Sequence, residues 1–361
     1  MNKKIIISGG GTLGHILPII PVIMDIYKQY DLYFLGTQKG LEKKYLENND
    51  YNKYFKKMYF LDMEGINRKN IFKNIKVLYK YYVIRKQIIK IYETIKPNLI
   101  IGMGGYISGV SIKIANSKKI KTIIHEQNAT MGLANKLVYK KVNKVLLSYD
   151  IPNIKNKVLV GNPRYSYIKE NYVSKDENKI LIVGGSLGSE FINNLIINNI
   201  EKLNIDYYNI ILITGKKYYN SNEALIQEKN KQYKHIKIFP FLDNLIEEMS
   251  TSTIVISRSG ATTISEIIAL AKPSILIPSP NVTANHQYLN ALDLYNKNCC
   301  LLIEEKDLTI TILVNSIRQI ITSYQYKKQI ISNLSIYYKN NPKDDFIDII
   351  NEEVWENISI I

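Results

Sequence analysis

The same three-part pattern, an apolar strand followed by a glycine turn and a helix, recurs in both halves of this chain. Lys4 to Ser8 runs directly into Gly9-Gly10-Gly11-Thr12-Leu13-Gly14-His15. Lys179 to Val183 runs in the same way into Gly184-Gly185-Ser186-Leu187-Gly188, and residues 190–203 then have helical spacing. Strands that alternate with helices form parallel sheets. The pattern therefore predicts an α/β protein with two parallel-sheet domains that face each other across a cleft.

The domain boundary is expected near the middle of the chain. Gly161-Asn162-Pro163 interrupts the pattern there, and the total of 361 residues suits two domains of ordinary size. The predicted domains are residues 1–163 and 164–339. The tail beyond about residue 311 has helical spacing, and we expect its last helix, about 340–361, to pack back on the first domain.

Basic residues are concentrated in the first predicted domain. Residues 1–163 hold 28 Lys and Arg against 10 Asp and Glu, a net charge of +18, and residues 164–361 hold 20 against 22, or −2. Such a surplus is either solvated surface or a sign of an anionic partner. The chain lacks zinc-finger spacing and RNA-binding aromatic patterns, so nucleic acid is not the expected partner.

A basic stretch at 65–96 has helical spacing, with apolar residues interleaved with lysines and arginines. It predicts either a surface helix with a buried apolar face or a patch that lies on anionic lipid. No run reaches the roughly 18 consecutive apolar residues of a membrane-spanning helix.

Residues 257–291 bring polar groups together at two successive helix starts. After the apolar strand 254–256, Ser259-Gly260 turns the chain into a helix that begins at Ala261. The free N–H groups of a helix start favour a phosphate. Thr262, Thr263 and Ser265 would add hydroxyl donors, and Glu266 is placed to accept two hydroxyls of a ribose.

The first glycine turn also predicts a phosphate or sugar site. It does not predict NAD binding, because the next strand, 31–35, ends in Gly36-Thr37 where an acidic residue would be needed. His15 closes this turn, at the edge where open α/β sheets bind ligands, and a histidine there is suited to accept a proton from a hydroxyl. The polar residues 125–128 follow another strand and are expected to line a cleft, since burying them unpaired is costly.

Six short motifs, taken together and in chain order, resemble one family of bacterial enzymes. They are GGTLGH at 10–15, GMGGYISG at 102–109, HEQNATMGLANK at 125–136, GGSLG at 184–188, RSGATTISE at 258–266 and QYLNAL at 287–292. The family is the N-acetylglucosaminyltransferase (MurG) that converts lipid I to lipid II in peptidoglycan synthesis. The resemblance covers nearly the whole chain, from Gly10 to Leu292.

The resemblance implies two Rossmann-like domains of the GT-B type and a glycosyltransferase that inverts configuration at the transferred sugar. It implies UDP-N-acetylglucosamine as donor and the C4 hydroxyl of the muramyl sugar of lipid I as acceptor. No cofactor or metal is implied, and the sequence has no Asp-x-Asp pair to hold a cation between phosphates. It further implies a peripheral protein on the cytoplasmic face of the inner membrane, held to the anionic surface by residues 65–96.

The resemblance also assigns roles to individual residues. His15 would be the catalytic base, and Glu126 would support it or the acceptor. Leu242 would contact the uracil through its backbone, and Asn128 the donor sugar. The donor-binding residues implied in this way are Thr12, Leu13, Gly14, Asn128, Arg164, Ser186, Leu242, Ala261, Thr262, Thr263, Ile264, Ser265, Glu266 and Gln287.

Four positions depart from the family pattern. Leu13 stands where the family usually has a glycine, which narrows the backbone freedom of the loop. GNPRY replaces the usual GNPVR, so Arg164 comes one place early. His286 replaces a common glutamine, and Ser279-Pro280 replaces Phe-Gln. These changes predict a reduced rate or altered donor contacts, not lost function.

Two other functions stay open. A UDP-sugar 2-epimerase shares the two-domain design and donor binding, but it would not need a lipid-facing patch. A catalytically inactive nucleotide-sugar-binding protein is argued against by His15, Glu126 and Glu266, although Leu13 keeps that interpretation open.

Overall fold

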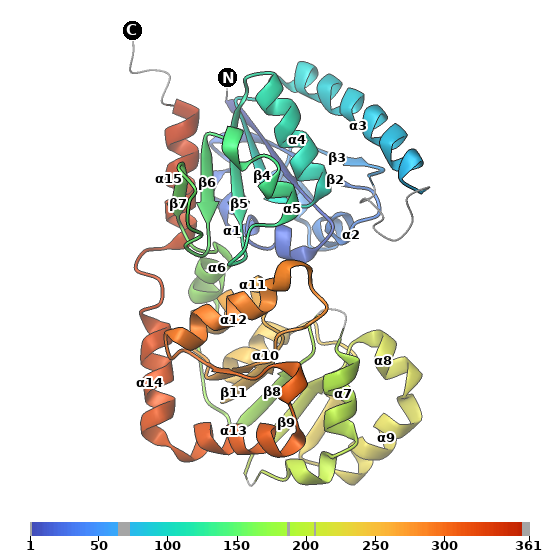
Figure 1. Ribbon diagram of the computed structural model, residues 1–361, viewed down its shortest axis with the longest axis vertical. Helices are drawn as coiled ribbons and strands as arrows, with labels where there is room; N and C mark the ends of the chain where they lie inside the picture. The colour runs from blue at the N-terminus through green and yellow to red at the C-terminus, as the bar shows by residue number, and fades with distance from the viewer. Residues whose placement is uncertain (1, 64–72, 186–187, 206, 356–361) are drawn as a thin grey trace. The chain divides into compact units, whose positions relative to one another are not determined.

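The chain folds into two compact units. The computed structural model describes residues 2–63, 73–185, 188–205 and 207–355, with backbone alone for 73–79. One unit comprises residues 1–166 with 340–361, and the other comprises residues 167–339. The boundary predicted from the sequence lay after residue 163, three residues before the observed one. In Figure 1 the last helix, α15 (Pro342–Trp355), drawn in red, lies with the blue and green elements of the first unit, where it packs against α1.

The first unit is built on a seven-stranded parallel sheet in the order β3-β2-β1-β4-β5-β6-β7. Its strands are β1 (Lys3–Gly9), β2 (Tyr30–Thr37), β3 (Lys57–Leu61), β4 (Leu99–Gly104), β5 (Lys121–Glu126), β6 (Lys144–Leu147) and β7 (Lys157–Leu159). Its other helices are α1 (Ile20–Ile26), α2 (Leu41–Asn48), α3 (Lys73–Ile95), α4 (Tyr106–Ser117) and α5 (Leu133–Lys136), with 3-10 turns η1 (Leu13–His15), η2 (Tyr51–Tyr54) and η3 (Tyr139–Lys141). Helix α6 (Arg164–Asn171) crosses the division between the units.

The second unit contains a six-stranded sheet in the order β10-β9-β8-β11-β12-β13. Its strands are β8 (Lys179–Val183), β9 (Asn209–Ile213), β10 (Ile236–Phe239), β11 (Ile254–Ser257), β12 (Ser274–Leu276) and β13 (Leu301–Leu302). Its helices are α7 (Glu190–Ile197), α8 (Lys216–Ser221), α9 (Glu223–Gln232), α10 (Leu245–Thr251), α11 (Ala261–Ala269), α12 (His286–Asn296), α13 (Ile310–Thr322) and α14 (Tyr324–Ser335), with 3-10 turns η4 (Ile200–Leu203), η5 (Thr283–Asn285) and η6 (Glu305–Asp307).

Each sheet has one place where its strand order reverses. In the first unit the chain moves from β1 outward to β3 and then returns to β4, on the other side of β1. In the second unit it moves from β8 outward to β10 and returns to β11. Open parallel sheets bind ligands beyond the carboxyl ends of the two strands at such a reversal. The glycine turns after β1, β4, β8 and β11 all lie at these places.

Strand β1 shows why these sheets form. Ile5, Ile6 and Ile7 are at most 1% exposed, because helices cover both faces of a parallel sheet. Ile5 and Ile7 pack with residues of α1 and α15, and Ile6 packs with residues of α3 and α4. Burying one such side chain contributes about 1.5–3 kcal/mol. The predicted parallel α/β fold is confirmed for both units.

Residues 16–30 have helical spacing, interrupted early by Pro18 and Pro21. The chain first forms η1 and then α1, which begins at Ile20. Pro18 and Pro21 explain the break, because proline lacks an N–H and is tolerated only in the first turn of a helix. The edge strands β3 and β13 were not expected from the sequence.

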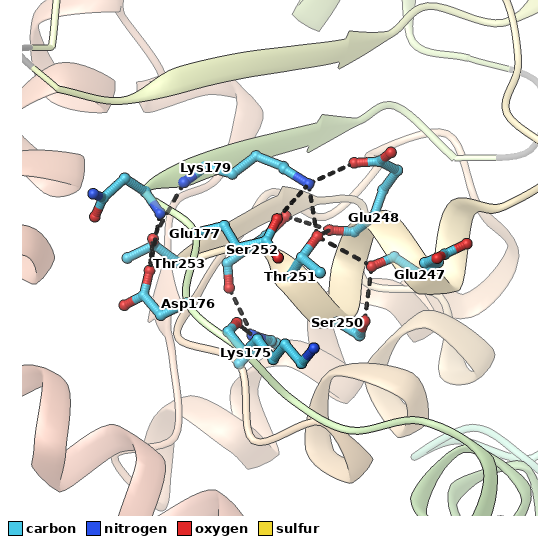
Figure 2. Close-up of polar contacts among 12 residues, drawn as sticks. Lys175, Asp176, Glu177, Lys179, Glu247, Glu248, Ser250, Thr251, Ser252 and Thr253 are labelled. Atoms are coloured by element: carbon cyan, nitrogen blue, oxygen red, sulfur yellow. Dashed lines mark hydrogen bonds and ion pairs between the residues drawn. The ribbon is translucent and has the colours of Figure 1, made fainter.

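Partly buried polar contacts join the amino ends of β8 and β11, at the opposite end of the sheet from the glycine turns (Figure 2). Lys179 Nζ lies 2.8 Å from Glu248 Oε2 and 2.6 Å from Thr251 Oγ1. Lys175 N donates to Ser250 O at 2.8 Å. These contacts hold α10 against the start of the sheet, so this polar cluster supports the second unit.

Candidate active site

The glycine turn after β1 is held against the end of β4. Gly10 N donates to Gly104 O at 3.3 Å. Gly11, Gly104 and Gly105 have φ values of +90°, +112° and +83°, which side-chain-bearing residues rarely adopt. A Cβ at Gly105 would come within 2.3 Å of Gly10 O. Glycine at these positions therefore allows the two turns of the first unit to touch at the strand reversal.

His15 lies in η1, at the end of this turn, and is half-buried. Its Nδ1 lies 2.9 Å from Gly10 O. A carbonyl oxygen only accepts hydrogen bonds, so Nδ1 carries the proton and Nε2 carries the lone pair. The ring packs on Gly104, where a Cβ would come within 2.7 Å of Cδ2. Across the described parts of the chain, Nε2 has no hydrogen-bond partner, so it is free to accept a proton.

The polar segment 125–128, at the carboxyl end of β5, is mostly buried and does not line a cleft as expected. His125, Glu126 and Gln127 are at most 2% exposed, whereas Asn128 is half-buried. His125 Nε2 donates to Gly161 O at 3.1 Å, and Gln127 Nε2 donates to Met103 O at 2.8 Å. Burial lowers the pKa of His125 to about 4, against the opposing effect of the Gly161 hydrogen bond. Partners inside the fold therefore satisfy these side chains.

Glu126 accepts hydrogen bonds with both carboxylate oxygens. Its Oε1 accepts from the backbone N and the Nδ2 of Asn128 at 3.2 and 3.1 Å. Its Oε2 accepts from Gly132 N at 2.8 Å and from Asn135 Nδ2 at 2.9 Å. The carboxylate thus ties down the loop that carries Asn128. This geometry favours a supporting role for Glu126 over direct contact with an acceptor.

Glu42 is a buried carboxylate beneath the first glycine turn that sequence reasoning missed. It is 0% exposed, and its Oε2 accepts a hydrogen bond from Gly11 N at 3.1 Å. Little in the sequence indicated this, because Glu42 belongs to the charged segment LEKKYLEN, which is typical of a solvated helix. Gly36 and Gly40, which leave room for its side chain, were the only hint.

In the second unit, α11 begins at the carboxyl end of β11 with no side chain capping its first turn. Its first internal hydrogen bond runs from Ile264 N to Gly260 O at 3.0 Å. The amides of Ala261, Thr262 and Thr263 precede that bond, and these residues are half-buried. A helix start of this kind is suited to an anion such as a diphosphate.

Two residues of the predicted donor site point away from solvent. Ile264 and Ser265 are each 1% exposed. Ser265 Oγ donates to Ala261 O at 2.9 Å and to Thr262 O at 2.8 Å. The expectation that Ser265 offers a hydroxyl to a phosphate is therefore wrong, because the helix already uses that proton. Glu266 is buried, 5% exposed, in the second turn.

The start of α12 is joined to the loop after β12. Gln287 Oε1 accepts from Ser279 N at 2.9 Å, and Ser259 Oγ donates to Gln287 O at 2.8 Å. Leu242 is half-buried in the loop between β10 and α10. Ser186 lies outside the described residues. Gln287 and the α11 turn thus lie together at the carboxyl edge of the second sheet.

Arg258 is a further residue whose role the sequence did not reveal. It is 8% exposed, and its Nη1 donates to Ile277 O at 3.1 Å and to Pro278 O at 3.0 Å. Its Nη2 contacts Ser189 Oγ and the carboxylate of Glu305. Its place directly before the SGATT turn was the only signal. The guanidinium joins the turns after β8, β11 and β12.

The structure shows the conformation and contacts of three residues that depart from the family pattern, Leu13, Arg164 and His286. Leu13 lies in η1 and is not among the residues with positive φ, so it does not strain the loop. Thr12 is exposed and Gly14 half-buried. Arg164 is 8% exposed at the start of α6, where its N donates to Asn162 Oδ1 at 3.0 Å. His286 Nδ1 donates to Thr283 O at 2.8 Å.

The basic stretch at 65–96 is described from Lys80 onward at the level of side chains, so the expectations for residues 65–79 lie outside that range. Ile84, Ile88, Ile91, Tyr92 and Ile95 are buried in the first unit. On the other face Arg85, Lys86 and Lys90 are exposed, and Lys80 pairs with Asp62 at 2.8 Å. The apolar stripe of this half of α3 is therefore core and does not lie on lipid. Its basic face stays open to solvent.

In all the parts of the chain that the structure describes, no helix is both long and apolar enough to span a bilayer.

Comparisons with known proteins agree with this geometry. Residues 5–147 match the family model for the glycosyltransferase family 28 N-terminal domain, and residues 179–348 match that for the C-terminal domain. The chain is 35% identical, over 97% of its length and 99% of the relative, to the Lactobacillus acidophilus UDP-N-acetylglucosamine–N-acetylmuramyl-(pentapeptide) pyrophosphoryl-undecaprenol N-acetylglucosamine transferase. It is 37% identical to the protein of the same name from Bacillus pumilus, over 88% of this chain and 90% of the relative.

Solved structures show the same fold. MurG of Acinetobacter baumannii superposes with a TM-score of 0.75 at 22% identity, covering 97% of this chain and 99% of that one. A putative UDP-N-acetylglucosamine 2-epimerase from Listeria monocytogenes reaches 0.72 at 11% identity, covering 99% and 98%. Fold alone therefore does not separate the transferase from the epimerase, but the curated relatives and the two matched domains do. The chain belongs to glycosyltransferase family 28 and, within it, to the bacterial UDP-N-acetylglucosamine–N-acetylmuramyl-(pentapeptide) pyrophosphoryl-undecaprenol N-acetylglucosamine transferases.

Proposed function

We infer that this protein transfers N-acetylglucosamine from UDP-N-acetylglucosamine to the muramyl sugar of lipid I, which gives lipid II for peptidoglycan synthesis. The observation that carries this inference is the 35% identity to a transferase of that name over 97% of the chain. The fold supports it with two strand reversals, each with glycine turns at its carboxyl edge, where open parallel sheets bind ligands.

In the proposed reaction His15 acts as the general base. The C4 hydroxyl oxygen of the muramyl sugar forms a bond to C1 of N-acetylglucosamine as the bond from C1 to the diphosphate breaks. The hydroxyl proton passes to Nε2 of His15, and UDP leaves. A single displacement of this kind inverts the configuration at C1. The support is the proton on Nδ1, required by the 2.9 Å contact with Gly10 O, which leaves Nε2 as the acceptor.

The donor is proposed to bind to the second unit. The uncapped start of α11, with Thr262 and Thr263, would receive the diphosphate and stabilise the charge that develops as UDP leaves. Glu266 would take the ribose hydroxyls, and Gln287 the sugar or a phosphate. Ser186, which precedes α7, would complete the diphosphate contacts, and Leu242 would meet the uracil through its backbone.

In the first unit, Thr12, Leu13 and Gly14 are proposed to approach the donor from the loop that carries His15. Asn128 would contact the donor sugar, held in place by Glu126. Arg164, which is 8% exposed at the start of α6, is also proposed as a donor contact. No cofactor or metal is proposed to take part.

The decisive experiment measures UDP release from UDP-N-acetylglucosamine in metal-chelated buffer, with and without a lipid I analogue. We expect release only with the acceptor. Release without acceptor would replace the proposal with an epimerase or hydrolase, since an epimerase of similar fold acts on the same nucleotide sugar. Binding without release would replace it with an inactive binding protein.

We further propose that the protein works as a peripheral protein on the cytoplasmic face of the inner membrane, where lipid I is available. The support is the net charge of +18 over residues 1–163 and the exposed Arg85, Lys86 and Lys90 on one face of α3. Basic residues near an anionic bilayer contribute about 1 kcal/mol each. The attraction would be electrostatic, because the apolar face of this half of α3 is buried.

A further inference from the structure

One peptide unit in the first glycine turn is held from both of its edges. The N–H of Gly11 donates to Glu42 Oε2 at 3.1 Å, and the carbonyl of Gly10 accepts from His15 Nδ1 at 2.9 Å. These two groups belong to the same peptide bond. Since the C=O and N–H of a trans peptide point in opposite directions, Glu42 and His15 lie on opposite sides of it.

The Glu42 carboxylate is fixed by its surroundings. Its Oε1 accepts from Thr37 N at 2.8 Å and from the Thr37 hydroxyl. A Cβ at Gly10 would come within 2.4 Å of Oε1, and one at Gly40 within 2.0 Å of Oε2. Glycine at both positions leaves room for the carboxylate to sit directly beneath the turn.

Both oxygens of Glu42 accept hydrogen bonds from backbone amides, which fits the ionised carboxylate. No cation pairs with it within the described ranges of the chain. Burying a charge without a counter-charge is costly unless donors satisfy it. Three donors do so here, and one of them is the peptide that also contacts His15. A glutamate on an ordinary helix surface keeps its carboxylate in water, whereas that of Glu42 is buried beneath the glycine turn.

The arrangement has a chemical consequence for His15. A negative charge beside the Gly11 N–H polarises the peptide and strengthens its carbonyl as an acceptor, because hydrogen bonds in a chain reinforce one another. The stronger acceptor holds the proton on Nδ1 and orients the ring, so that the lone pair on Nε2 points away from the turn. It also stabilises the imidazolium that forms when Nε2 takes a proton. Carboxylates that contact a catalytic histidine directly act in the same way.

We propose that Glu42 is a positioning residue for His15 and acts on it through the Gly10–Gly11 peptide. The proposal rests on the proposed function insofar as His15 is the base. It adds a carboxylate that belongs to none of the six motifs that identify the family.

The test begins with the wild-type protein, because this result does not depend on how a variant folds. Imidazole ¹⁵N chemical shifts distinguish the Nδ1–H from the Nε2–H tautomer. The chain has four histidines, so the spectrum of His15→Ala assigns the signal. We expect His15 to be the Nδ1–H tautomer at neutral pH. An Nε2–H tautomer would overturn the proposal at once.

The second step compares Glu42→Gln with Glu47→Gln, a matched control at an exposed position of the same helix. Glu42→Gln should give a mixture of tautomers and lower kcat about 10- to 100-fold, the usual cost of losing such an outer partner. KM for the donor should change less than kcat, because most of the proposed donor contacts come from the second unit. Glu47→Gln should leave the tautomer and both kinetic constants unchanged.

Glu42→Asp, which keeps the charge on a shorter side chain, should recover part of the lost kcat. Unchanged tautomer and kcat in Glu42→Gln would reduce Glu42 to a structural support and overturn the proposal. Failure of the proposed function gives a different result: the tautomer would still depend on Glu42, but His15→Ala would keep its activity.

Discussion

Arg258 Nη2 lies 2.6 Å from Ser189 Oγ, and this contact joins the two glycine turns of the second unit. Ser189 caps α7 by accepting from Ile192 N at 3.3 Å, directly after the glycine turn of β8. Arg258 directly precedes the turn into α11. A single buried guanidinium therefore fixes the spacing of the two helix starts at the strand reversal.

Replacing Arg258 with lysine should weaken both donor binding and the second unit. Lysine keeps the charge but cannot supply the fork of donors that reaches Ile277 O, Pro278 O and Ser189 Oγ together. We expect a loss of about 1–3 kcal/mol in the free energy of unfolding and about tenfold in UDP affinity. Urea denaturation and calorimetric titration measure the two. Arg318→Lys, at an exposed position of α13, is the matched control. Wild-type UDP affinity in Arg258→Lys would show that the turns keep their spacing without the guanidinium.

His15→Ala should separate chemistry from binding. We expect kcat to fall by roughly 100- to 10,000-fold, the usual contribution of a general base. UDP affinity should stay within about twofold of wild type, since the proposed contacts with the diphosphate, ribose and uracil come from the second unit. Steady-state rates of UDP release and calorimetric titration provide the comparison. His235→Ala, in the second unit and away from both sets of turns, is the control. A near-normal kcat in His15→Ala would remove the base assignment.

The elements that the sequence predicted well are those whose signal is local. An apolar strand, a glycine turn and a helix start are consecutive in the chain, so β1, β8 and β11 were found together with the turns that follow them. His15 was likewise singled out by its place at the end of the first glycine turn, and its contact with Gly10 spans only five residues. Its role as the base stays a prediction.

What could not be predicted depends on contacts between distant segments. Glu42 meets Gly11 across 31 positions, and Arg258 meets Ser189 across 69. No periodicity marks such pairs. The prediction for the polar segment 125–128, at the carboxyl end of β5, failed for the same reason. Its polar side chains suggested a cleft, but they form hydrogen bonds inside the fold. One partner is Gly161, which lies 36 residues from His125 in the chain.

Glu126→Ala should cost stability, because it leaves the donors of Asn128, Gly132 and Asn135 without their acceptor. Of these residues only Asn135 is buried, whereas Asn128 is half-buried and Gly132 is exposed, so water can satisfy part of the loss. An unsatisfied buried donor costs about 1–3 kcal/mol, and we expect a total loss of about that size. Glu126→Gln should lose less, since its carbonyl still accepts on one side. Urea unfolding is measured alongside kcat. If Glu126→Gln keeps wild-type stability but loses more than about 100-fold in kcat, the carboxylate acts in the chemistry itself.

Charge reversal on α3 tests the membrane proposal. Arg85, Lys86 and Lys90 are exposed on one face of the helix. Changing all three to Glu should release the protein from phosphatidylglycerol vesicles, with at least a tenfold weaker partition, because each basic residue contributes about 1 kcal/mol at an anionic surface. Co-sedimentation at low and high salt measures the partition.

The control for this experiment reverses three exposed lysines of the second unit, Lys231, Lys234 and Lys237. It changes the net charge by the same amount on a different surface. Equal loss of vesicle binding in both variants would mean that total charge, and not the face of α3, governs the association.

The buried His125 should make the first unit sensitive to acid. Burial lowers its pKa to about 4 in the folded protein, whereas the unfolded chain takes up the proton near pH 6.5. Above pH 6.5 neither state is protonated, and the pH dependence from this group vanishes. Below it the unfolded state binds the extra proton, so stability falls as the pH drops toward 4. The loss between pH 7 and pH 5 is about 2 kcal/mol.

Urea denaturation of wild type and His125→Gln at pH 7 and pH 5 measures this effect. The amide cannot titrate, so the variant should start less stable at pH 7 but lose about 2 kcal/mol less on acidification. The difference between the two proteins isolates His125 from the other acid-sensitive groups, which both share. The same acid sensitivity in both would show that His125 is protonated in the folded protein near its ordinary pH, and that the contact of its Nε2 with Gly161 O at 3.1 Å suffices to hold a buried imidazolium.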